Sequence, residues 1–126
     1  MAIISDIIGV TDCIFCKIAK EEIPAEFLYE DDLVVAFKDT RPIAPVHILV
    51  VPKEHIESIA GLKDSDEKLA GRLIMTAKNL AQKEGIAENG YKLLFRVGRH
   101  GGQEVPHVHL HLLGGAPLSE GIHPIK

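Results

Sequence analysis

Strand-like runs of apolar residues occur three times in the first half of the chain. Two of them, residues 25–30 and 33–38, are separated only by two aspartates, which is the spacing of a tight antiparallel hairpin. The third, residues 47–51, is rich in β-branched residues and is bracketed by two prolines. The pattern therefore predicts three consecutive strands.

A pattern of helical period begins in the middle of the chain. Asp64 and Glu67 have the spacing of a helix start, and apolar residues then recur every three or four positions. Gly85 suits the end of such a helix because glycine readily takes the left-handed conformation found there. One long helix is expected over about residues 65–84.

Two further strands are expected at residues 91–97 and 107–113, with a glycine-rich bend between them. The resulting order is β-β-β-α-β-β. Sequential strands of this kind usually pair as antiparallel neighbours, so the order predicts an α+β fold.

Length, composition and charge restrict the class of protein. The chain has 126 residues, of which 46% are apolar and 25% charged, as in a single globular domain. It has no apolar run of about 18 residues, which disfavours a membrane partner, and its net charge of -4 disfavours nucleic acid. The start of the chain lacks the basic region of a signal peptide. We expect a cytoplasmic protein with an N-terminal extension at residues 1–12 and one domain over residues 13–126.

Three histidines alternate with apolar residues in the segment His107-Val108-His109-Leu110-His111-Leu112-Leu113. In a strand, alternate side chains share one face, so the three imidazoles would project together while their neighbours enter the core. A single histidine at such a position is usually an ordinary polar residue. Three in strict alternation favour catalysis or metal binding, because imidazole is both a nucleophile and a metal ligand near neutral pH.

Cys13 and Cys16 form a CxxC pair. Such a pair can be half of a zinc site, two free structural thiols or a redox centre. The redox interpretation requires a thioredoxin-like βαβ setting, which the pattern does not contain, so zinc is favoured.

The motifs together resemble the histidine triad (HIT) family, in its Hint-like branch of bacterial type with the CxxC pair. Residues 107–113 match the signature His-x-His-x-His-x-x of that family, and residues 13–18, 44–55 and 101–103 also match. The similarity extends from Cys13 to about Gly115. It implies a HIT-like fold, with an antiparallel sheet of about five strands, one long helix and a short N-terminal helix.

The resemblance also implies an activity. Members of this branch hydrolyse purine nucleoside phosphoramidates or related nucleotidyl bonds through a covalent nucleotidyl-histidine intermediate. By this resemblance His109 is the nucleophile, His111 contacts the phosphate near the leaving group, and His47 belongs to the proton network, with His107 as the remaining member of the catalytic set. The alternatives are a non-catalytic nucleotide-binding module and a hydrolase in which all three histidines hold a catalytic metal.

The resemblance further implies a nucleotide site and a structural zinc ion. It places five apolar residues around the base: Ile14, Phe15, Ile18, Phe37 and Leu49. Taken alone, these would be interpreted as core. Asp39 would bind the ribose hydroxyls, and the backbone around Gly102, Gln103 and Glu104 would approach the phosphate. The zinc ligands would be Cys13, Cys16, His55 and His107.

Two positions depart from the pattern of the family. Arg96 stands where the Hint-like pattern usually has asparagine, and Glu104 stands where animal members have serine. Arg96 either points into the site from the face opposite Phe95 or lies solvated on the outside of the sheet.

We also expect a homodimer, since a lone sheet with one helix leaves a strand edge to cover.

Overall fold

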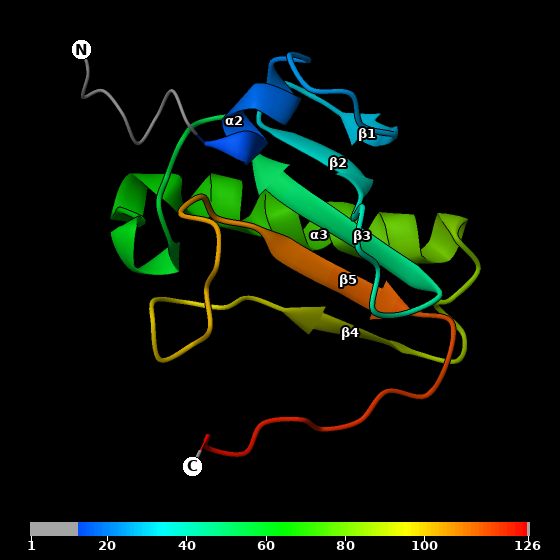
Figure 1. Cartoon of the computed structure of the whole chain (residues 1–126). Helices are drawn as coiled ribbons and strands as arrows, with labels where there is room; N and C mark the ends of the chain where they lie inside the picture. Colours follow the sequence, from blue (N-terminus) through cyan, green and yellow to red (C-terminus); the bar gives the residue numbers. More distant parts are fainter. Residues whose placement is uncertain (1–12, 126) are drawn as a thin grey trace.

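The computed structural model describes residues 13–125, and the expected extension at residues 1–12 lies outside this range. Helix α3 (Glu67–Lys83) covers one face of a five-stranded antiparallel sheet, and the short helix α2 (Ile14–Ala19) packs on the opposite face (Figure 1). The predicted α+β fold is confirmed. Among the described residues, no helix has both the length and the apolar character needed to cross a membrane.

The sheet has the spatial order β1-β2-β3-β5-β4, with every neighbouring pair antiparallel. Its strands are β1 (Phe27–Glu30), β2 (Val34–Lys38), β3 (Val46–Pro52), β4 (Tyr91–Leu94) and β5 (Leu110–Gly114). Because β5 inserts between β3 and β4, residues from the middle and the end of the chain lie side by side at the centre of the sheet.

Alternation along the strands divides the buried side chains between two cores. On β2, Val34 and Ala36 pack with α3, whereas Val35 and Phe37 pack with α2. The same alternation continues through the histidine segment, where Val108, Leu110 and Leu112 belong to the core under α3. The intervening histidines are therefore directed away from α3.

The long helix was predicted correctly, but its start differs in detail. A 3₁₀ turn, η2 (Asp64–Asp66), precedes it, and the Asp66 carboxylate accepts a hydrogen bond from the Lys63 backbone N–H at 2.9 Å. The helix begins at Glu67, so Asp64 lies in the preceding 3₁₀ turn and does not cap the helix through Glu67. At the C-terminus Gly85 has φ of 77°, and the bonds Gly85 N–H to Gln82 O and Ile86 N–H to Ala81 O form a Schellman motif.

Both strands of the second half are shorter than predicted. The strand expected at 91–97 ends at Leu94, and the one expected at 107–113 begins at Leu110. In the segment before β5, the His107 N–H donates to the Val105 carbonyl at 2.8 Å and the Val108 N–H donates to Ile56 O at 2.7 Å. These bonds take the backbone groups that a strand would use for pairing, so the sheet begins only after His109.

Candidate active site and metal centre

Strand β3, strand β5 and the residue just before β5 bring three buried histidines together on the face opposite α3. Leu49 of β3 lies directly opposite His111 of β5, and His47 is two residues before Leu49 on the same face. The His47 Nε2 and His111 Nδ1 atoms are 2.9 Å apart, and the rings of His109 and His111 have centroids 5.0 Å apart. His47, His109 and His111 are each less than a tenth exposed.

The hydrogen bonds of these histidines define where each neutral ring carries its proton. The Ile43 backbone N–H donates to His47 Nδ1 at 3.2 Å, so His47 carries its proton on Nε2 and donates it to His111 Nδ1. His111 therefore carries its own proton on Nε2. His109 is held separately, because its Nδ1–H donates to the His107 carbonyl at 2.7 Å, which leaves the Nε2 lone pair of His109 free.

The site favours neutral imidazoles. Burial lowers the pKa of His47 and of His109, and the positive charge of Arg96 acts in the same direction on both. Burial and the neighbouring histidines lower the pKa of His111 to about 4. A neutral, buried imidazole with a free Nε2 lone pair is suited to nucleophilic attack.

Arg96 reaches this cluster from the segment that follows β4. Its guanidinium Nη1 lies 3.4 Å from His111 Nε2, while the preceding Phe95 packs against the core under α3. Asp39 contacts a different ring, with its Oδ2 3.4 Å from His47 Nε2. The site therefore has a cation beside His111 and a carboxylate beside His47.

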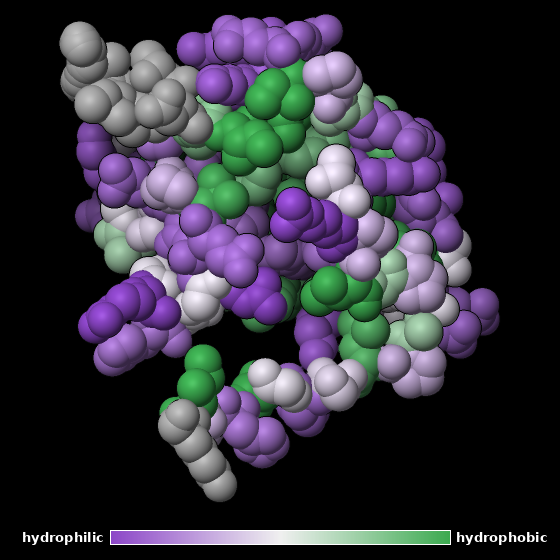
Figure 2. Space-filling view, in the orientation of Figure 1, coloured by the Kyte–Doolittle hydropathy of each residue, from purple (hydrophilic) through white to green (hydrophobic). Residues whose placement is uncertain are grey.

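The expected base-binding residues form an apolar cluster beside His109. Phe15 of α2 lies edge-on to His109 with ring centroids 5.0 Å apart, and it also contacts Phe37 at 5.8 Å. Ile18 and Leu49 are buried in the same cluster. Ile14 differs, because it is 45% exposed, and apolar side chains gather on the surface around α2 (Figure 2).

The Gly101-Gly102-Gln103 bend is braced by its own hydrogen bonds. The backbone N–H groups of all three residues donate to carbonyls within the bend, at 3.1 to 3.2 Å. The Gln103 side chain accepts from the Gly98 N–H and donates to the carbonyls of Glu57 and Val105. These N–H groups are thus engaged within the bend in this structure, and their approach to a phosphate stays a prediction. Glu104 lies near enough to His109 for its carboxylate to act on the pKa of that ring, in the direction that opposes burial.

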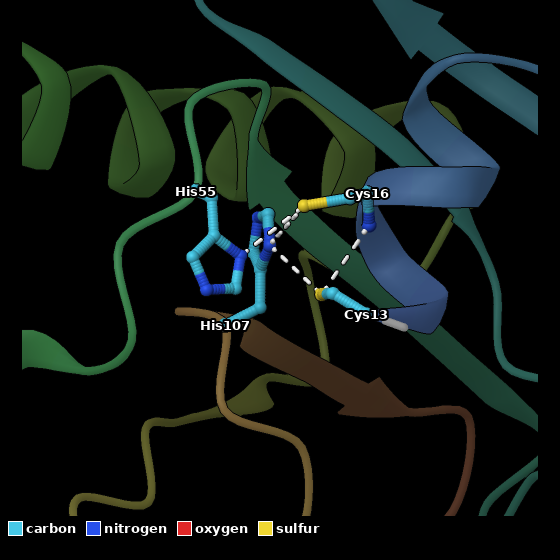
Figure 3. Close-up of side chains that lie close together, drawn as sticks. All are labelled: Cys13, Cys16, His55 and His107. Carbon is cyan, nitrogen blue, oxygen red and sulfur yellow. Dashed lines mark hydrogen bonds between the residues drawn. The ribbon is translucent and has the colours of Figure 1, made fainter. Parts of the chain in front are cut away.

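A second cluster joins Cys13 and Cys16, at the start of α2, to His55 after β3 and His107 before β5 (Figure 3). Their donor atoms all lie within 4.8 Å of one another. Cys13 Sγ is 3.4 Å from His107 Nδ1, and Cys16 Sγ is 3.2 Å from His55 Nδ1 and 3.5 Å from His107 Nδ1.

These separations fit a tetrahedral zinc ion. Bonds of about 2.3 Å to sulfur and about 2.0 Å to nitrogen place ligand atoms about 3.5 Å apart in that geometry. His107 Nε2–H donates to the Pro52 carbonyl at 2.8 Å, so the Nδ1 lone pair faces the sulfurs, as a second hydrogen bond of this kind usually ensures for a metal ligand. Burial and the neighbouring Cys13 raise the pKa of Cys16 to about 11, so a bound cation is what would favour the thiolates.

The structure thus separates the histidines of the signature into two sites. His109 and His111 lie with His47, whereas both ring nitrogens of His107 are engaged on the cysteine side and with Pro52. The two sites remain linked through the backbone, because the carbonyl of His107 accepts the hydrogen bond from His109.

Sequence reasoning missed the partners that fix the rings. The Ile43 N–H and the Pro52 carbonyl are main-chain groups, and no residue type marks them in the sequence. Their only signal was the position of both residues next to strands that were predicted correctly.

The fold and the site define a member of the HIT family. The HIT domain family model matches residues 20–118, so the chain belongs to this family. It is 50% identical over 107 residues to the purine nucleoside phosphoramidase of Escherichia coli (strain K12), covering 85% of this chain and 90% of that protein.

Solved structures agree with this assignment. A HIT family hydrolase from Legionella pneumophila Philadelphia 1 superposes with a TM-score of 0.85 at 50% identity, covering 87% of this chain and 98% of that one. A zinc-bound histidine triad family protein from Mycobacterium smegmatis superposes with a TM-score of 0.75 at 26% identity, covering 89% of this chain and 83% of that one.

Proposed function

We propose that this protein hydrolyses purine nucleoside phosphoramidates or related nucleotidyl compounds through a covalent intermediate on His109. The observation that carries the proposal is the hydrogen bond from His109 Nδ1–H to the His107 carbonyl, which directs a free Nε2 lone pair into the site. The identity to a purine nucleoside phosphoramidase supports the choice of substrate class.

The reaction has two displacements at phosphorus. In the first, His109 Nε2 attacks the α-phosphorus, a bond from nitrogen to phosphorus forms, and the bond to the leaving amine breaks as the amine takes up a proton. In the second, water attacks the same phosphorus, releases a proton and displaces His109, giving the nucleoside monophosphate. Burial keeps His109 neutral before attack, and the Nε2–H of His111 is available to a phosphoryl oxygen.

The nucleoside is assigned to the side of the site formed by α2 and β2. Phe15 and Phe37 provide an apolar wall next to His109, and Ile14, Ile18 and Leu49 extend it. Asp39 lies beside His47 with a partly exposed carboxylate, which suits hydrogen bonds to the ribose hydroxyls.

We assign the second cluster to a structural zinc ion. Two cysteines and two histidines would hold it, and it would join α2 to the segments before β5 and after β3. When bound, the ion supplies cross-linking of these segments and takes no part in the reaction.

The remaining proposals concern organisation. Residues 13–126 are assigned to one domain, since α2 packs on the sheet and its cysteines lie with His107, just before β5, in one cluster. The protein would act in the cytoplasm, where a reducing environment keeps a CxxC pair available to metal. It would form a homodimer, because β4 ends the sheet with Leu93 exposed and α3 exposes Ile74 and Met75.

Turnover of adenosine 5′-phosphoramidate by a His109→Ala variant tests the proposal. We expect the variant to lose turnover while its affinity for AMP stays within about tenfold of wild type, because the base and ribose contacts lie elsewhere. His100→Ala, at an exposed histidine in the neighbouring loop, is the matched control and should retain full activity.

Three outcomes separate this proposal from its alternatives. Activity above a few percent in His109→Ala would remove His109 from its role. Wild-type protein that binds AMP without turnover would indicate a non-catalytic module. Activity abolished by a strong chelator and restored by metal, with the protein still folded, would indicate a catalytic ion.

A further inference from the structure

Arg96 and His111 present two hydrogen-bond donors to the same space. The chain of hydrogen bonds from the Ile43 N–H through His47 leaves the proton of His111 on Nε2. Arg96 carries only donors, and its Nη1 is 3.4 Å from that same Nε2. Two donors at this distance do not satisfy each other, so an acceptor that enters beside them can take a hydrogen bond from each.

Nothing in the described part of the chain supplies that acceptor to Arg96. Within residues 13–125, no carboxylate forms an ion pair with its guanidinium, and its one polar side-chain contact is His111. A half-buried arginine without an anionic partner is unusual, because its charge is normally paired when it leaves solvent.

The local backbone holds Arg96 in this position. Phe95, which precedes it, packs against the core under α3 and so anchors the backbone next to Arg96. The Arg96 stem lies against Gly102, where a Cβ atom would be 3.5 Å from Arg96 Cδ. Gly102 has φ of 79°, a backbone conformation that residues other than glycine rarely adopt. The absence of a side chain there leaves room for the arginine stem.

The charge of Arg96 affects the pKa of all three histidines of the site. It lowers the pKa of His47, His109 and His111, although burial is the largest cause in each case. Asp39 acts in the opposite direction on all three. Arg96 is therefore placed to act on any charge that enters the site near His109.

We propose that Arg96 and His111 together form a two-donor site for an anionic phosphoryl oxygen, which makes Arg96 a specificity-determining residue for nucleotides over nucleosides. The inference rests on the proposed function, since it deepens the recognition of the same substrate. A guanidinium can donate two parallel hydrogen bonds to phosphate and keeps its charge at all relevant pH values. An asparagine at this position would donate a hydrogen bond without the charge.

Binding of AMP and of adenosine, measured by titration calorimetry at low and high salt, tests the inference. At low salt, Arg96→Asn should weaken AMP binding about tenfold, as loss of one charge-assisted contact does. Adenosine has no phosphate, so its affinity should not change. The loss for AMP should shrink at high salt, because ions screen a partly exposed charge.

Two further variants control the measurement. Arg99→Asn removes an exposed arginine from the same bend and should leave both affinities unchanged. Arg96→Lys keeps the charge without the fork and should retain part of the salt-dependent affinity for AMP, even if Arg96→Asn proves poorly folded.

The outcomes are distinguishable. Equal affinity of wild type and Arg96→Asn for AMP at low salt, with turnover intact, would overturn the role of Arg96 and leave the proposed function standing. An equal loss for adenosine would also overturn it, since the effect would then be structural. Wild-type protein that binds neither adenosine nor AMP would overturn the proposed function together with this inference.

Discussion

Replacing Asp31 by alanine tests how the β1–β2 hairpin is held in the register that presents Phe37 and Asp39. The Asp31 carboxylate accepts four hydrogen bonds. Its Oδ1 accepts from the backbone N–H groups of Leu33 at 2.7 Å and Val34 at 2.9 Å, and its Oδ2 accepts from the Tyr29 hydroxyl and from Arg72 of α3. The side chain is 17% exposed. Asp31 thus connects the turn of the hairpin to the helix.

The magnitude follows from the two backbone bonds. Each contributes about 1 kcal/mol to the free energy of unfolding, so Asp31→Ala should lower that free energy by about 2 kcal/mol. The contacts with Tyr29 and Arg72 are partly screened by solvent and contribute little to the free energy of unfolding beyond these two bonds. For a chain of this length, the loss corresponds to a fall in melting temperature of roughly 8 °C.

The pH dependence gives the prediction a second test. Burial tends to raise the pKa of Asp31, but the hydrogen bonds from Val34, Leu33, Tyr29 and Arg72 outweigh it and hold the pKa well below its usual range. Because the folded-state pKa is lowered, the stabilisation is complete above the ordinary carboxyl pKa of about 4 and is lost as the pH falls further. The gap between wild type and Asp31→Ala should therefore narrow below about pH 4.

Thermal unfolding followed by circular dichroism between neutral and acidic pH is the assay. Asp32→Ala is the matched control, since Asp32 is the next residue, is 86% exposed and lies 3.7 Å from Arg72. It should unfold like wild type. Asp31→Asn retains an acceptor for the backbone N–H groups, so its melting temperature should lie between those of Asp31→Ala and wild type. The reasoning would be refuted if Asp31→Ala and Asp32→Ala had equal melting temperatures. It would also be refuted if the difference in melting temperature between wild type and Asp31→Ala widened on acidification.

The remaining predictions concern metal and assembly. Protein purified without chelator should contain about one zinc ion per chain, and Cys13→Ser or Cys16→Ser should lose both the zinc and thermal stability; elemental analysis that finds no zinc in wild type would contradict this. His123→Ala, at an exposed histidine, is the control and should keep the ion. Sedimentation velocity should show a homodimer at micromolar concentration, and a monomer there would count against the use of β4 and α3 as an interface.

The elements with a strong local signal were predictable from the sequence. Helix α3 has a regular apolar period and is followed by Gly85, a glycine of positive φ, so its extent follows from nearby residues. The hairpin and β3 were equally clear, because short apolar runs and turn residues alternate there. The alternation around His109 also indicated correctly which side chains enter the core under α3.

The features that were missed depend on contacts distant in sequence. His107 was expected in a strand, but its neighbour Val108 bonds to Ile56, and that partner leaves no mark in the local pattern. The braced bend at Gln103 is a similar case, because its side chain reaches the carbonyl of Glu57. For Arg96, strand alternation left two faces open, and the structure places its guanidinium beside His111.

The stereochemical course at phosphorus tests the central claim, a covalent intermediate, most directly. A nucleoside thiophosphoramidate that is chiral at phosphorus would be hydrolysed in isotopically labelled water, and the configuration of the product determined. Two successive in-line displacements, by His109 and then by water, predict net retention of configuration. Net inversion would mean that water attacks the substrate directly, and it would contradict the account.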